Sequence, residues 1–168
     1  MSVSRIRLLV VIALIDVAFT AGAIILARRL MWNATPSVPK GLYFRRPAAA
    51  VTVGSTVVVP IPPSMRALIA ERRYLPASYD LMKRVVAMPG DVVCLDSRDY
   101  RVNGRRIAHV QAVDSRRRPL PVYNFCGLVP RGRAFVATAA PLSLDSRYFG
   151  PVPLSTLTVV TPLWTSSP

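Results

Sequence analysis

A single long apolar run occupies the start of the chain, from Leu8 to Ala27, and Asp16 is the only charged residue within it. A helix of this length covers about 30 Å, the hydrocarbon thickness of a lipid bilayer. Residues 1–29 are therefore expected to form a membrane signal anchor. A cleaved signal peptide is the alternative, but its apolar core would span about 7–15 residues and precede a small-residue cleavage site. The run here is longer and is followed by Arg-Arg-Leu-Met-Trp.

After Trp32 the pattern changes to short apolar stretches separated by proline and glycine. Asn103-Gly104 predicts a tight hairpin turn, and only residues 64–74, which follow Pro62-Pro63, have a helical pattern. The other segments are rich in Val, Tyr and Phe and predict strands. These predicted strands are 41–45, 52–60, 82–88, 91–95, 133–138 and 157–163. The fold class expected is mainly β, with a β domain over residues 30–168 tethered by one N-terminal transmembrane helix.

Composition adds a strong positive charge to this picture. Of the 22 basic residues only Lys40 and Lys83 are lysines, and 8 acidic residues leave a net charge of +14. This charge indicates an anionic partner, either nucleic acid or a membrane surface. Because the arginines are scattered and form no nucleic-acid-binding motif, membrane lipid is favoured over nucleic acid. The single histidine, His109, is expected on a hairpin or at the surface, and no metal or other cofactor is expected.

Cys94 and Cys126 are the only cysteines of the chain. In an oxidising compartment a disulfide between them would stabilise the fold by about 3–4 kcal/mol in the chain-entropy model. Two buried free thiols are the alternative. Neither cysteine lies in a recognisable cysteine–histidine setting, so a cysteine nucleophile is not favoured.

Residues 33–43 hold two hydroxyl side chains, Thr35 and Ser37, between prolines that restrict the backbone. A nucleophilic serine needs such rigidity because its attack geometry tolerates little error. Residues 81–93 place Lys83 on an apolar strand that turns at Pro-Gly-Asp. Burial and the neighbouring Arg84 would lower the pKa of this lysine toward that of a general base. Each segment alone also fits ordinary structure, as a proline turn or as a lysine that discourages aggregation at a sheet edge.

Residues 143–152 contain Asp145 two residues before Arg147, a spacing that alone fits a local ion pair. Together, the three segments resemble the signal peptidase I superfamily of membrane-bound serine peptidases, and most closely its conjugative-transfer (TraF-type) members. Thr-Pro-Ser-Val-Pro-Lys-Gly-Leu-Tyr resembles the nucleophile box of that subgroup. Lys-Arg-Val-Val-Ala-Met-Pro-Gly-Asp resembles the lysine box, and Asp-Ser-Arg-Tyr-Phe-Gly-Pro-Val resembles the C-terminal box.

The resemblance implies a Ser–Lys dyad, with Ser37 as nucleophile and Lys83 as general base. The backbone N–H of Ser37 and the hydroxyl of Thr35 would form the oxyanion hole. Ser143 would orient the lysine amine, and Asp145 and Arg147 would form a supporting pair beside the site.

The implied substrate is a pre-protein or pilin precursor, cleaved on the periplasmic side of the bacterial inner membrane, and in the conjugative subgroup the product can be cyclised. The arginines that flank the apolar run favour this orientation only slightly. Two alternatives stay open. One is general secretory signal peptidase I activity, and the other is a non-enzymatic, basic, membrane-anchored binding module of a conjugation apparatus.

Overall fold

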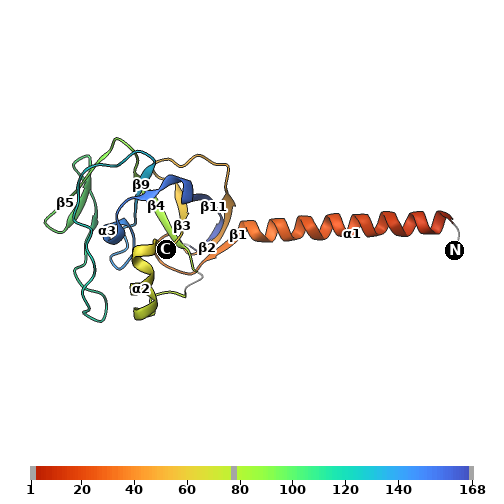
Figure 1. The fold of residues 1–168 in the computed structure, drawn as a ribbon, viewed down its shortest axis with the longest axis horizontal. Coiled ribbons are helices and arrows are strands. Elements are labelled where there is room, and N and C mark those ends of the chain that lie inside the picture. The colour runs from red at the N-terminus through yellow and green to blue at the C-terminus, as the bar shows by residue number, and fades with distance from the viewer. Residues whose placement is uncertain (1–2, 77–78, 167–168) are drawn as a thin grey trace.

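The computed structural model describes residues 3–76 and 79–166, so the chain ends 1–2 and 167–168 and the pair 77–78 lie outside the described residues. One helix, α1 (Val3–Arg29), projects from a β domain (Figure 1). It is long and apolar enough to cross a membrane, and its apolar span is not buried against the domain. Strand β1 (Leu30–Asn33) begins at the residue after α1, so the helix enters the sheet without a linker.

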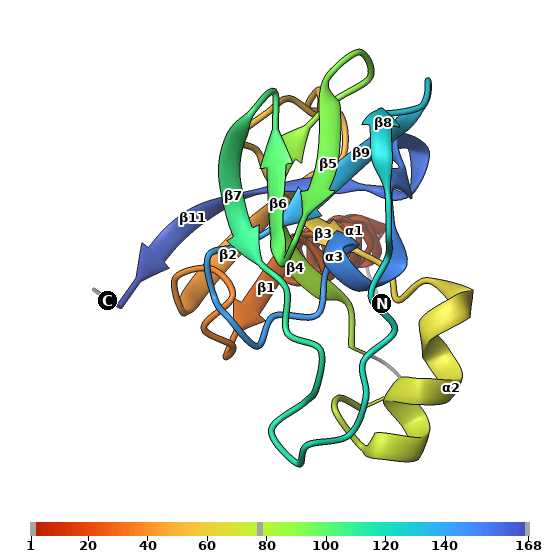
Figure 2. The ribbon, with the colours of Figure 1, turned by 90° about the vertical axis from the view of Figure 1, so that its left-hand side faces the viewer.

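The strands form two antiparallel sheets, which Figure 2 shows one in front of the other. The larger sheet has the order β1-β2-β11-β3-β4-β9-β10, and the smaller has the order β7-β6-β5-β8. Besides β1, the larger sheet contains β2 (Gly41–Arg46), β3 (Thr56–Val59), β4 (Leu81–Ala87), β9 (Arg133–Ala137), β10 (Val152–Pro153) and β11 (Thr158–Thr165). The smaller contains β5 (Val92–Asp96), β6 (Asp99–Val102), β7 (Arg105–His109) and β8 (Cys126–Leu128). The prediction of a mainly β domain is confirmed.

Local sequence explains where several elements begin and end. Asn103 and Gly104 both have positive φ, 48° and 81°, which confirms the predicted hairpin turn between β6 and β7. Helix α2 (Pro63–Arg72) begins with a proline, whose missing N–H costs nothing there, and ends at Arg73 in the left-handed conformation. A strand was expected to start at residue 52, and this is wrong. Residues 52–55 form a turn in which Gly54 has φ 90°, and β3 starts only at Thr56.

Apolar side chains cover both faces of the larger sheet. On one face Val57, Val85 and Phe135 belong to the main core, which also receives Met65 and Ile69 from α2. On the other face a smaller cluster contains Tyr43, Val58, Met82, Val160 and Val38. Because alternate residues of a strand point to opposite faces, Lys83 lies on the same face of β4 as Leu81 and Val85. Its amine therefore enters the apolar interior.

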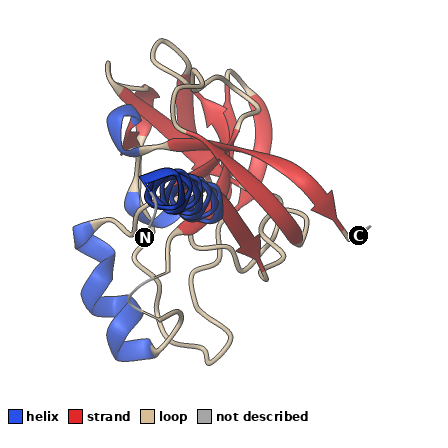
Figure 3. Ribbon diagram, turned by 90° about the vertical axis from the view of Figure 1, so that its right-hand side faces the viewer, coloured by secondary structure: helices blue, strands red, loops and turns tan. Residues whose placement is uncertain are grey.

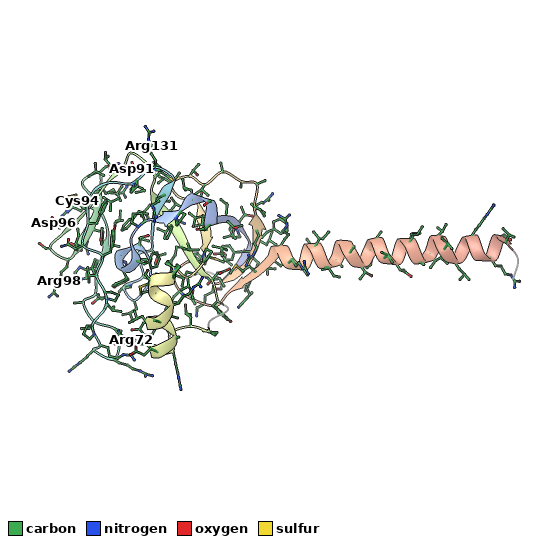
Figure 4. All side chains as sticks on the ribbon, viewed as in Figure 1. Arg72, Asp91, Cys94, Asp96, Arg98 and Arg131 are labelled. Carbon is green, nitrogen blue, oxygen red and sulfur yellow. A yellow bond between two sulfur atoms is a disulfide. The ribbon has the colours of Figure 1, made fainter. Side chains whose placement is uncertain are left out.

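The smaller sheet lies at the end of the domain far from α1, where Figure 4 labels Cys94 and Asp96. Cys94 and Cys126 face each other in the pairing of β5 with β8 and are joined as a disulfide. The expected cysteine pairing is thus present in the structure.

Beside the sheets, α2 and the segment 112–120 lie next to each other (Figure 2). The carboxylate of Asp114 joins them. It accepts hydrogen bonds from the Tyr74 hydroxyl and from Arg118, and it pairs with Arg72 at 3.6 Å. Viewed along α1, α2 lies to one side of the sheets (Figure 3). The two segments therefore form one wall at the side of the domain.

Candidate active site

Ser37 lies in the loop 34–40 that connects β1 to β2. The last residue of β1, Asn33, pairs with Gly41, so the loop is closed at its base by the sheet. Gly41 has φ 153°, and a Cβ there would overlap the backbone of Trp164 in β11. Only glycine lets β11 approach this closely. The glycine of the Pro-Lys-Gly-Leu-Tyr motif therefore allows β11 to pack against the base of the serine loop.

Lys83 reaches Ser37 from β4, where it pairs with Val57 of β3. Its Nζ lies 2.8 Å from the Ser37 Oγ and 2.7 Å from the Ser143 Oγ. The two serine oxygens are 3.3 Å apart, so the three side chains form a closed triangle. Ser37 lies 46 positions from Lys83 along the chain and Ser143 lies 60, so the three side chains are brought together by the fold.

The lysine is only 3% exposed. Burial lowers its pKa from 10.5 to about 8, because the charged ammonium loses its hydration. The Asp145 carboxylate raises this pKa and the Arg147 guanidinium lowers it, and both effects are smaller than that of burial. At pH 7, about one unit below this pKa, roughly one Lys83 amine in ten is therefore uncharged and able to accept a proton.

Asp145 and Arg147 are both fully buried. They form a bidentate pair, with Arg147 Nε and Nη2 each donating to a different Asp145 oxygen at 2.8 Å. The same guanidinium donates to the Ser143 carbonyl at 3.1 Å and to the His109 carbonyl at 2.6 Å. The pair thus fixes the backbone of Ser143, whose hydroxyl accepts from Lys83. Among the described residues, no hydrogen bond joins this pair to the serine loop.

Of the two groups expected to donate to the oxyanion, one is free in this structure and the other is already hydrogen-bonded. Within the described part of the chain the backbone N–H of Ser37 has no hydrogen-bond partner, which leaves it free to donate. The Thr35 hydroxyl instead donates to Asn33 Oδ1 at 2.9 Å. Thr35 would have to release this bond before it could bind an oxyanion.

A cleft of about 910 Å³ opens over Ser37, Lys83 and Ser143. Tyr74, which follows α2, and Asp114 of segment 112–120 are among the residues that line the cleft. Along the cleft, residues 81–83 of β4 pair only with β3 among the strands that the structure describes, because β9 pairs with β4 from position 84 onward. An extended peptide can add to this open stretch of β4 as an additional strand.

A comparison with known protein families identifies the family of the chain that carries this Ser–Lys–Ser triangle. The family model described as "Signal peptidase, peptidase S26" matches residues 3–164, nearly the whole chain. The chain belongs to the signal peptidase S26 family. The resemblance inferred from the three sequence boxes is thereby confirmed.

This S26 family member is similar to known conjugation proteins. It is 36% identical over 159 residues to a plasmid transfer protein TraF from Escherichia coli, with 86% of this chain and 88% of the relative covered. It is 35% identical over 167 residues to a conjugal transfer protein TraF from Agrobacterium tumefaciens (strain 15955), with 90% of each covered. A signal peptidase I from Enterococcus faecalis V583 is a distant structural neighbour, with a TM-score of 0.40 and 20% identity, covering 65% of this chain and 94% of that one.

The structure brings most of the predicted site residues of this S26 member together. Ser37, Lys83 and Ser143 are in mutual contact, and Asp145 and Arg147 lie directly behind Ser143. The disulfide Cys94–Cys126 lies in the other sheet. His109 also stays outside the triangle, since its ring bonds Asp99 at 2.9 Å.

Sequence reasoning missed Asn33. This side chain is 5% exposed and bonds the serine loop on both sides of Ser37. The signal available was an asparagine directly before a loop with two prolines, a setting in which Asx side chains often bond nearby backbone.

Proposed function

We propose that this chain is a membrane-anchored serine endopeptidase in which Lys83 is the general base for Ser37. The observation that carries the proposal is the 2.8 Å contact between the buried Lys83 amine and the Ser37 hydroxyl. Geometry within hydrogen-bond reach and a pKa near the working pH are the two requirements for a general base. Membership of the S26 family supports the same assignment.

In the proposed reaction the neutral amine of Lys83 takes the Ser37 proton as Oγ attacks the scissile carbonyl. The resulting ammonium then gives its proton to the leaving amine, and an acyl-enzyme on Ser37 remains. Ser143 supports both steps: its oxygen lies 2.7 Å from the lysine Nζ, and both the neutral amine and the ammonium have an N–H to donate to it. Asp145 and Arg147 act as positioning residues through Ser143.

The developing oxyanion would be met by the free N–H of Ser37 and, after it leaves Asn33, by the Thr35 hydroxyl. One preorganised donor of this kind can be worth about 3–4 kcal/mol in the transition state. The substrate would bind as an extended segment along residues 81–83 of β4, which orients its carbonyl over Ser37.

Membrane attachment is proposed through α1. Trp32 and Trp164 stack at the end of the domain that adjoins α1, with ring centroids 6.0 Å apart, and both are more than half exposed. Tryptophans with an exposed apolar face are typical of membrane–water interfaces. The Cys94–Cys126 disulfide supports a location of the domain outside the cytoplasm, because disulfides persist in oxidising compartments. We therefore place the domain on the periplasmic side of a bacterial inner membrane.

The proposed substrate is a pilin precursor of a conjugation system, because the relatives are a plasmid transfer protein and a conjugal transfer protein. The acyl-enzyme would be resolved by water or, with cyclisation, by the substrate's own N-terminal amine. General signal-peptide cleavage uses the same dyad and is the second candidate. A purely binding role is not favoured, since it gives no reason to bury a lysine against a serine hydroxyl.

The test is mass analysis of a pilin precursor co-expressed with the full-length chain in a membrane host. Wild type should yield a shortened product, lighter by one further water molecule if it is cyclised. Ser37→Ala and Lys83→Arg should leave the precursor intact, because arginine keeps the charge and cannot act as a neutral base. Lys40→Arg is the matched control, since Lys40 ends the serine loop but is exposed and is not among the residues that line the cleft. Processing of the precursor by both site variants would refute the dyad.

A further inference from the structure

Asn33 occupies the inside of the loop that carries Ser37. It is the last residue of β1, and its side-chain amide turns back into the loop instead of toward solvent. Asn33 Nδ2 lies 2.9 Å from the carbonyl of Thr35, 3.0 Å from that of Val38 and 3.1 Å from that of Pro39. An amide nitrogen has two hydrogens, so one of them is shared between two carbonyls. The three carbonyls lie on both sides of Ser37.

The acceptor side of the same amide is also used. Asn33 Oδ1 accepts from the Thr35 backbone N–H at 3.2 Å and from the Thr35 hydroxyl at 2.9 Å. The Asn33 side chain therefore takes the place of the backbone hydrogen bonds that pair neighbouring strands. The loop cannot supply all of these itself, because Pro36 and Pro39 have no N–H to donate. Tyr43 adds one further bond from outside, with its hydroxyl donating to the Pro39 carbonyl at 2.7 Å.

We propose that Asn33 is a positioning residue for the nucleophile, and this inference rests on the proposed role of Ser37. By holding the backbone on both sides of Ser37, Asn33 keeps Oγ at its 2.8 Å distance from Lys83 Nζ. It also keeps the Thr35 hydroxyl close to the site but engaged until an oxyanion competes for its proton. The hydrogen bonds of the Asn33 side chain in the described structure all go to the serine loop and none to Lys83 or Ser143, so Asn33 acts through the loop.

This role predicts a particular kinetic signature. Asn33→Ala should lower kcat about 100-fold, the cost expected when a reacting group is displaced by about 1 Å. KM should stay within about threefold, because residues 81–83 still bind the substrate backbone. The pH at which activity falls on the acid side should not move, because the described hydrogen bonds of the Lys83 amine go to Ser37 and Ser143 and not to Asn33. A merely structural role would lower the fraction of folded protein and leave kcat per folded molecule unchanged.

Asn33→Asp separates donation from acceptance. It keeps the size of the side chain and the acceptor for the Thr35 N–H and hydroxyl, but it loses the N–H groups that hold the carbonyls of Thr35, Val38 and Pro39. It should therefore be as impaired as Asn33→Ala, and it carries the test if the alanine variant fails to fold. A double-mutant cycle with Thr35→Ala should show a combined loss at least threefold smaller than the product of the single losses, because the two side chains act together.

The closing experiment measures cleavage kinetics and amide hydrogen exchange on the full chain in detergent, with Asn124→Ala as the matched control at an exposed asparagine. We expect faster exchange in peptides covering 34–43 for both Asn33 variants, and wild-type exchange for the control. Wild-type kcat in a folded Asn33 variant would overturn the inference. If wild type itself cleaves nothing, the proposed function fails, and the exchange measurement still decides on Asn33: unchanged protection of the loop would refute its positioning role.

Discussion

Burying an amine beside a serine should carry a stability cost that depends on pH. The pKa of Lys83 falls from 10.5 in water to about 8 in the folded protein, chiefly because the charged form loses its hydration. Between these two values the unfolded chain binds more protons than the folded one, so stability rises with pH. The cost is fully present below pH 8 and disappears as the pH rises past about 10.5. At about 1.4 kcal/mol for each pKa unit, it amounts to about 3 kcal/mol.

Lys83→Met removes the ionisable group and keeps an unbranched side chain of similar length. The variant also loses the bonds to Ser37 and Ser143, but that loss is roughly the same at every pH. The informative quantity is therefore the difference in unfolding free energy between Lys83→Met and wild type, measured by urea denaturation at pH 7 and at pH 10.5. We expect the unfolding free energy of Lys83→Met minus that of wild type to be about 3 kcal/mol smaller at pH 10.5 than at pH 7.

A matched control comes from the other lysine. Lys40 is exposed, and Lys40→Met should change the unfolding free energy by less than about 0.5 kcal/mol at either pH. A difference between Lys83→Met and wild type that stays constant from pH 7 to pH 10.5 would refute the claim that folding lowers the pKa of this lysine.

Three further predictions concern the groups around the dyad. Asp145→Asn leaves the buried Arg147 charge unpaired and should lower the unfolding free energy by about 3–5 kcal/mol in urea denaturation; a loss below about 1 kcal/mol would contradict the buried pair. Ser143→Ala removes one of the two hydroxyl oxygens that accept from the lysine amine, so it should reduce kcat at least tenfold with a nearly unchanged melting temperature. A Ser143→Ala variant with the kcat of wild type would contradict this role. Replacing Cys94 and Cys126 by serine should cost about 3–4 kcal/mol of stability, yet leave the pH dependence of cleavage in place because the bond lies in the other sheet; a shifted pH profile would show coupling that this fold does not predict.

Much of the architecture follows from local pattern. The apolar run predicted the long helix and the Asn103-Gly104 pair predicted the hairpin, because each of these elements depends on residues close together in the chain. Strands β8 and β10 were not predicted, since three and two residues are too short for a periodic signal. They exist because neighbouring strands offer them hydrogen-bond partners, which is a property of the whole fold.

The candidate site divides in the same way. Ser37 and Lys83 could be named from the motifs around them, but their 2.8 Å contact depends on the order β3-β4 and on the loop between β1 and β2. The bond from Arg147 to the His109 carbonyl could not be foreseen, because it joins α3 (Ser146–Phe149) to the end of a strand in the other sheet. The position of Asn33 depends on how the loop closes around its amide.

The dependence of kcat/KM on pH tests the central claim most directly, because it reports the protonation state of the free enzyme's essential base. With a precursor peptide and the full-length chain, kcat/KM should rise about tenfold per pH unit on the acid side and level off above about pH 8, the pKa of Lys83. A rise that continues to about pH 10.5, the ordinary pKa of a lysine, or an activity independent of pH would contradict a buried neutral amine as the base for Ser37.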